Sequence, residues 1–219
     1  MLSKVKGKIS KDDGNAVIVL GIILIIAALL VGGMLLDISK AYQLKASYTE
    51  SARKATQSGI SQQNAGGYLK AEAAAEAVRV YETIARPASI KEGYMSSCSS
   101  NRNVLITITF MKEGFIPGSH VITINSNQVQ DISDPNLSRQ NIINKMRVNG
   151  QQMTASHRRA IENSQYTGIE MVLEESTPNV ILPGATTLSG LDVDDLNCQK
   201  IGIKAGASQF IGDIDGNYN

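Results

Sequence analysis

An uninterrupted apolar run near the N-terminus constrains this chain more than any other feature. Residues 16–36, AVIVLGIILIIAALLVGGMLL, contain no charge, no amide side chain and no proline. At about 1.5 Å of rise per residue, a helix of this length measures roughly 31 Å, which matches the hydrocarbon core of a bilayer. A secretory signal has a shorter apolar core that ends at a small-residue cleavage site. No Ala-x-Ala site follows this run, so we expect a retained transmembrane helix.

The distribution of lysines predicts the orientation of this helix. The leader at residues 1–15 holds Lys4, Lys6, Lys8 and Lys11, whereas the first turns beyond the span hold Lys40 and Lys45. Because positive charge accumulates on the cytoplasmic side, the leader is expected to be cytoplasmic. We therefore expect a single-pass protein of the cytoplasmic (inner) membrane with most of its chain extracytoplasmic.

Composition and motifs argue against several classes of function. The net charge of +1 and the 19% of charged residues give no support to nucleic-acid binding. The chain has no CxxC, HExxH, Walker A or GxGxxG motif, and its two histidines, His120 and His157, are far apart in sequence. We interpret His120 as a strand-edge residue. The sequence therefore predicts a protein that is not an enzyme.

The two cysteines, Cys98 and Cys198, both follow the predicted span. An oxidising compartment permits a disulfide between them, which closes a loop of about 100 residues and contributes roughly 4–5 kcal/mol in the chain-entropy model. The alternative is a pair of free thiols. We expect the disulfide.

The helical pattern continues beyond the membrane. Apolar residues recur at three- and four-residue steps to about residue 58, which predicts an amphipathic stalk. A second helix is predicted at residues 68–86, with Pro87 ending it. Glu76 with Arg79, and Glu82 with Arg86, are expected to form surface ion pairs on this helix. The stalk region is thus residues 37–86.

Residues 87–219 change to an alternating pattern. Apolar and polar residues alternate at 104–110 and 121–125, which predicts antiparallel strands joined by a loop at 111–118. Short helices are expected at 134–147 and 151–165, and VNGQ between them either follows a helix end or forms a hairpin turn. Further strand signals are at 169–173, 179–182 and 201–203. The predicted fold class is α+β, with a small antiparallel-sheet domain after the helices.

Small residues in the span offer a helix-packing surface. Ala28 and Gly32 form a small-xxx-small pair through which a partner helix can approach closely. The alternative is that both residues reflect only the frequency of Ala and Gly in membrane spans. Both interpretations stay open.

A resemblance to a known family rests on residues 14–58, GNAVIVLGIILIIAALLVGGMLLDISKAYQLKASYTESARKATQS. A glycine lies at the membrane boundary, and an apolar span, an acidic residue, an aromatic residue and an Ala-rich helix follow it. This pattern resembles the N-terminal segment of the TadE and TadG group of Flp (Tad) pilus-assembly proteins. The matching positions are Gly14, Asp37, Tyr42, Leu44, Ala52 and Ala55.

Two positions depart from the family pattern. Pseudopilins of this group have a glutamate five residues after the processed glycine, where this chain has Val19. Gly14 is the candidate processing site, but Val19 argues against cleavage and we expect the leader to be retained. Longer TadG-like proteins carry a von Willebrand type A domain with an Asp-x-Ser-x-Ser metal site. The nearest string here, Asp131, Ser133 and Pro135, lacks the last ligand.

Pilin-like subunits share the order of long helices first and short strands later, so we expect the small antiparallel-sheet domain to be pilin-like. The resemblance implies a non-enzymatic, membrane-anchored component of Tad pilus assembly, acting as a minor pilin, pseudopilin or assembly scaffold. Its expected partners are other pilus subunits and the membrane, without nucleic acid or an obligatory cofactor. The alternative is a membrane-tethered extracytoplasmic binding or adhesion module. Its candidate calcium ligands are Asp213, Asp215 and Asn217, whose alternating oxygens are similar to part of a calcium loop.

Overall fold

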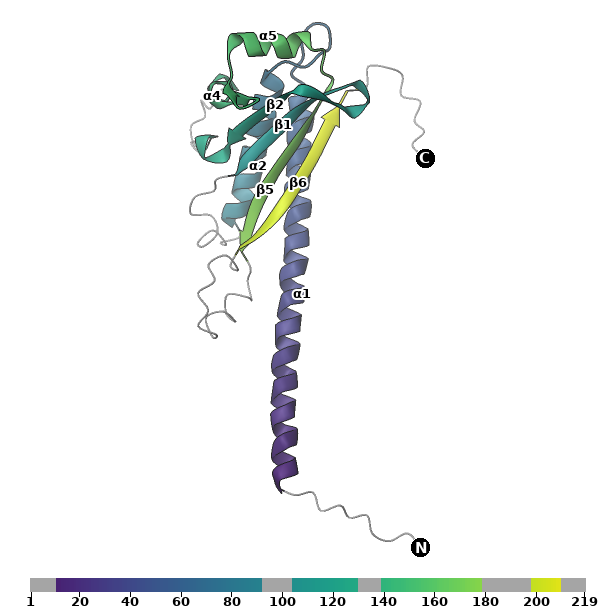
Figure 1. Cartoon of the computed structure of the whole chain (residues 1–219), viewed down its shortest axis with the longest axis vertical. Coiled ribbons are helices and arrows are strands. Elements are labelled where there is room, and N and C mark those ends of the chain that lie inside the picture. The colour runs from purple at the N-terminus through teal and green to yellow at the C-terminus, as the bar shows by residue number, and fades with distance from the viewer. Residues whose placement is uncertain (1–10, 92–103, 130–138, 179–197, 210–219) are drawn as a thin grey trace.

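The computed structural model describes residues 11–91, 104–129, 139–178 and 198–209. These residues form a long N-terminal helix and a head of antiparallel sheet and shorter helices (Figure 1). The fold is α+β with a pilin-like arrangement, as the sequence predicts. The helices are α1 Lys11–Gly59, α2 Glu72–Lys91, α4 Arg139–Lys145 and α5 Ala155–Asn163. The strands are β1 Leu105–Lys112, β2 Ile116–Asn125, β3 Arg147–Val148, β4 Gln151–Gln152, β5 Gly168–Pro178 and β6 Cys198–Ser208.

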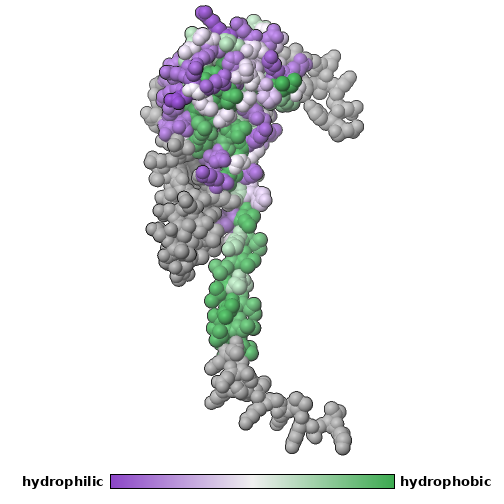
Figure 2. Space-filling view, in the orientation of Figure 1, coloured by the Kyte–Doolittle hydropathy of each residue, from purple (hydrophilic) through white to green (hydrophobic). Residues whose placement is uncertain are grey.

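Helix α1 has two parts with different surroundings. Its first part projects from the head with apolar side chains exposed (Figures 1 and 2). Its second part packs on the head, where it contacts α2, β5 and β6. The side chains that α1 buries there include Tyr48, Ala52 and Ala55. The predicted span and the first predicted helix of the stalk region are therefore one continuous helix, which ends at Gly59.

Helix α2 lies against α1 through small side chains. Ala73 and Ala77 are fully buried beside α1, where a Cβ built at Gly59 would lie 2.7 Å from the Ala73 carbonyl oxygen and 3.2 Å from Ala77 Cβ. Ala74 and Ala75 are fully buried as well. The helix begins at Glu72, after the predicted start at residue 68, and it continues through Pro87 to Lys91, so the predicted end at Pro87 is wrong. A proline inside a helix loses one hydrogen bond to the carbonyl four residues earlier. That residue is Thr83, which is exposed, so water can satisfy its carbonyl.

The sheet has six strands in the order β4-β3-β2-β1-β5-β6, and every described pairing is antiparallel. Alternate residues of the central strands are buried against the helices, as the alternating pattern predicts. The buried set on β1, β2 and β5 includes Ile106, Ile108, Phe110, Ile122, Ile124, Ile169, Met171 and Leu173. On β6 the same face presents Ile201, Ile203 and Ala205.

Two hairpins differ in detail from the predicted boundaries. The loop between β1 and β2 is only the short 3₁₀ turn Glu113–Phe115, because Met111 still pairs with Pro117. Between β3 and β4, Asn149 and Gly150 have φ of 48° and 83°. Two successive residues with positive φ are typical of a type I′ hairpin turn. VNGQ is thus a hairpin turn, and α4 ends before it, at Lys145.

The predicted helix at 151–165 and the strands predicted at 169–173 and 201–203 are confirmed with changed lengths. Helix α5 begins after Thr154, whose side chain accepts a hydrogen bond from the backbone of His157. Strands β5 and β6 pair from Gly168 with Ser208 to Pro178 with Cys198, well beyond the predicted runs. The predicted strand at 179–182 and the predicted start of a helix at 134 lie outside the described residues.

Candidate functional site

The exposed apolar part of α1 is the first candidate site. Large apolar side chains from Val17 to Leu36 are exposed around the whole helix. Figure 2 shows a continuous hydrophobic surface on the face of this helix that is in view. This helix is long and apolar enough to cross a membrane, a test that a signal sequence also passes. An apolar surface of this extent is unfavourable in water. It therefore requires an apolar environment, supplied either by lipid or by other apolar helices.

The small-residue pair lies within this surface. A side chain built at Gly32 meets no atom within 4 Å, so the described chain leaves that position open. Ala28 is nine residues before Asp37, which is about two and a half helical turns. Asp37 is buried, and Ala28 therefore faces the opposite side of the helix. The pair that the sequence singles out is free of contacts within the described chain.

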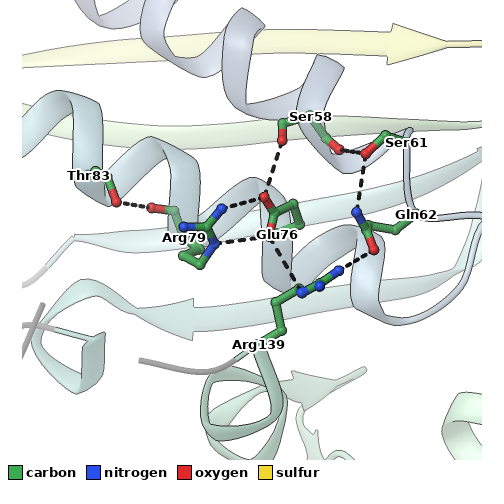
Figure 3. A network of polar contacts seen from close by, with 7 residues as sticks. All are labelled: Ser58, Ser61, Gln62, Glu76, Arg79, Thr83 and Arg139. Carbon is green, nitrogen blue, oxygen red and sulfur yellow. Dashed lines mark hydrogen bonds and ion pairs between the residues drawn. The ribbon is translucent and has the colours of Figure 1, made fainter. Parts of the chain in front are cut away.

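A second candidate site is a polar network where α1, α2 and α4 meet (Figure 3). The Glu76 carboxylate accepts hydrogen bonds from Arg79 Nε at 2.9 Å and from Arg79 Nη2 at 2.6 Å. Ser58 Oγ, in the last turn of α1, donates to Glu76 Oε1 at 3.3 Å. Arg139 Nε, on α4, lies 3.8 Å from Glu76 Oε2, and Arg139 also donates to Gln62. One carboxylate therefore ties together three helices.

The ion pair of Glu76 with Arg79, which the sequence predicts at the surface, has a buried carboxylate. The Glu76 side chain is only 9% exposed, since α1 and α4 cover the face of α2 that carries it. The hydrogen bonds from Arg79 are the largest cause of a lowered pKa of Glu76, so the carboxylate is charged at neutral pH. Glu82 is buried as well, and its predicted partner Arg86 has a side chain outside the described set. The network ties α1, α2 and α4 together within the head.

A third cluster surrounds Tyr166, which follows α5 and is 1% exposed. Its hydroxyl is 2.7 Å from His120 Nδ1 on β2, and its ring lies 5.2 Å from that of Phe110. A Cβ at Gly118 would lie 2.2 Å from the Tyr166 ring, so only glycine fits beside it. His120 lies beyond the last pair of β2 with β3, at the edge of the sheet there, and it packs against this tyrosine.

We expect the imidazole of His120 to titrate below the ordinary pKa of histidine. Burial is the first cause of this lowered pKa, and the charge of His157 is the second. A folded-state pKa below the unfolded value destabilises the fold only as the pH falls below about 6.5. In NMR titrations, His157→Gln should move the pKa of His120 upward but leave it below about 6.5, because burial remains. A pKa of His120 at or above that ordinary value in either protein would contradict this prediction.

Several predicted site residues lie outside the described part of the chain. They are Cys98, Asp213, Asp215 and Asn217. Cys198 opens β6, and its pairing with Cys98 stays a prediction. Gly14 is in the first turn of α1. Within the described ranges, no three His, Cys, Asp or Glu side chains come together as metal ligands.

The polar contacts reveal residues that sequence spacing did not identify. Only Glu76 and Arg79 are linked by helical spacing, whereas Ser58 and Arg139 are brought to the carboxylate by tertiary packing. The contact between His120 and Tyr166 joins residues 46 apart in sequence. No family model, curated protein or solved structure matches this chain.

Proposed function

We propose that this chain is a non-enzymatic, membrane-anchored component of Tad (Flp, type IV-like) pilus assembly. In this role it acts as a minor pilin, a pseudopilin or an assembly scaffold. The observation that supports the proposal is the division of α1 into an exposed apolar part and a part that is built into the core of the head. A helix shared in this way couples the position of the head directly to whatever surrounds the apolar part.

The exposed apolar surface suits both a membrane and a helical assembly. In a bilayer, lipid chains cover it and the backbone groups are satisfied within the helix. Outside the bilayer, the same surface must be covered by apolar helices of other subunits, because exposing it to water is costly. Anchoring and assembly therefore draw on the same residues, which is why a subunit or scaffold role fits this architecture.

The proposed topology can be measured with fusions. We expect a reporter that is active only outside the cytoplasm to be active when fused after Asn219, because the lysine-rich leader favours the cytoplasmic side. The same reporter fused before Met1 should be inactive at equal expression. An inactive C-terminal fusion at normal expression would invert the proposed orientation.

The proposed assembly role can be tested at Gly32, one residue of the small-residue pair in the span. Gly32→Leu should abolish pilus assembly, or recovery of co-purifying subunits, because helices in lipid associate through close van der Waals approach. The position is open in the described chain and leucine favours insertion, so membrane levels and folding should stay unchanged. Pilus counts and partner recovery are measured at matched membrane levels.

The matched control for this test is Leu24→Ile. Leu24 lies on the exposed span, and the change alters shape without altering hydrophobicity. It should leave assembly unchanged. If Gly32→Leu assembles as the wild type does, the span serves only as an anchor and the assembly surface lies on the head.

A further inference from the structure

The exposed apolar surface of α1 extends further along one side of the helix than along the other. On one side, Asp37 is 7% exposed, and Ala41 and Leu44 pack against the core of the head. On another side, Ile38 is 49% exposed and Tyr42 is 70% exposed. These two residues are four apart, so they are neighbours on the helix surface. The apolar surface thus extends beyond the span on the side that the head leaves open.

The length of this extension corresponds to the polar layer of a bilayer. Tyr42 is six residues beyond Leu36, which is a rise of about 9 Å. Side chains in a helix lean toward its N-terminus, so the Tyr42 ring reaches back toward the span by about one turn, roughly 5 Å. The ring then lies about 4 Å beyond the hydrocarbon edge. The headgroup layer on each side of a bilayer is about 5–7 Å thick, so the ring falls within it.

The chemistry of the patch also fits this layer. Tyrosine combines an apolar ring with a polar hydroxyl and is enriched where membranes meet water. Lys45 is three residues further along and exposed on the same side of the helix, and a long lysine side chain can keep its charged end in water beside lipid. Helix–helix interfaces in lipid favour small residues, whereas Ile38, Tyr42 and Lys45 are all large.

We infer that Ile38, Tyr42 and Lys45 form a docking surface for the headgroup layer of a lipid bilayer, and that Tyr42 sets the depth of α1. This inference rests on the proposed membrane anchoring and goes beyond it. The head is then held at a fixed height, because the other side of the same helical segment is packed into it. A charged residue at position 42 changes that height without changing the fold of the head.

The absence of tryptophan from the chain makes this inference directly measurable. Tyr42→Trp introduces a single tryptophan at an exposed position, so the fold is preserved. The full-length variant is placed in phosphatidylcholine vesicles whose acyl chains carry bromine either near the headgroup or near the chain end. Emission of the tryptophan introduced at position 42 should be lost more with the shallow bromine than with the deep bromine, and its maximum should shift to shorter wavelength than in water.

Two other single-tryptophan variants calibrate the depth. Ile26→Trp, near the middle of the span, should lose more emission with the deep bromine. Thr49→Trp lies two turns beyond Tyr42 on the same face, about 10 Å higher, and should be quenched by neither lipid. All three positions lie on one helix, so the comparison reports their relative heights.

The outcomes separate this inference from membrane anchoring itself. Quenching at position 26 without quenching at position 42 overturns the docking surface and leaves the anchor intact. A tryptophan at position 42 whose emission shifts to shorter wavelength but is quenched by neither lipid is covered by protein, such as a second copy of the chain, and also overturns it. Absence of quenching at position 26 refutes the anchoring, and the proposed function fails with it.

Discussion

Replacing Gly59 by alanine is expected to lower the free energy of unfolding by about 1–3 kcal/mol, the usual cost of overpacking a core. An alanine Cβ at this position would lie 2.6 Å from Ile169 Cδ1 and 2.7 Å from the Ala73 carbonyl oxygen. The isoleucine terminus can rotate away, but the carbonyl belongs to the α2 backbone and cannot move alone. Intrinsic helix propensity favours alanine over glycine by about 1 kcal/mol. The steric conflict outweighs this preference, because α1 and α2 must separate to admit the methyl group.

The matched control is Gly202→Ala on β6. Gly202 is exposed, its φ is outside the positive range, and an added Cβ meets no atom within 4 Å. This change should leave stability unchanged or slightly raise it, since it reduces the entropy of the unfolded chain. Both variants are compared by chemical denaturation of the full-length protein in detergent micelles. A Gly59→Ala protein as stable as the wild type would mean that the helices do not pack as closely as described.

Replacing Glu76 by alanine should destabilise the head by about 2–3 kcal/mol, because it removes one partner of a buried charged network. Arg79 and Arg139 then lose their shared carboxylate, and Ser58 loses its acceptor. The Arg79 side chain is partly exposed and can be rehydrated, which keeps the cost below that of a fully buried pair. The effect should also depend on pH in a defined direction.

The pH dependence follows from the lowered pKa of Glu76. A carboxyl whose pKa is lower in the folded state contributes stability above its unfolded pKa, near 4.5, and loses that contribution as the pH falls. The stability difference between the wild type and Glu76→Ala should therefore be full at neutral pH and shrink in acid. Denaturation curves between neutral and acidic pH measure this difference.

Glu50 provides the matched control for Glu76. It forms the same i,i+3 arginine pair, with Arg53 Nε 2.8 Å from Glu50 Oε2, but both side chains are exposed to solvent. Solvent screens such a pair, so Glu50→Ala should have a much smaller effect on stability. If both substitutions lowered stability equally, the burial of Glu76 under α1 and α4 would add nothing to its contribution to stability.

Several features of the fold could be predicted from local sequence patterns. The run at residues 16–36 specifies a long apolar helix by length alone, whatever surrounds it. The alternation at residues 104–110 defines which side of β1 is buried, because successive strand residues face opposite ways. Both patterns depend on neighbours within a few positions in the chain. The α+β class follows from the order of such patterns.

Tertiary structure decided what local patterns leave open. Helical spacing pairs Glu76 with Arg79, but only the packing of α1 and α4 makes that pair buried. The dipeptide Asn149–Gly150 is compatible with a helix end or a hairpin turn, and pairing of β3 with β2 selects the turn. Pro87 has no N–H to donate to the carbonyl of Thr83. It is tolerated inside α2 because Thr83 is exposed, where water can bind that carbonyl. Local spacing assigns residues to faces, whereas burial and ion-pair strength depend on which distant segment covers each face.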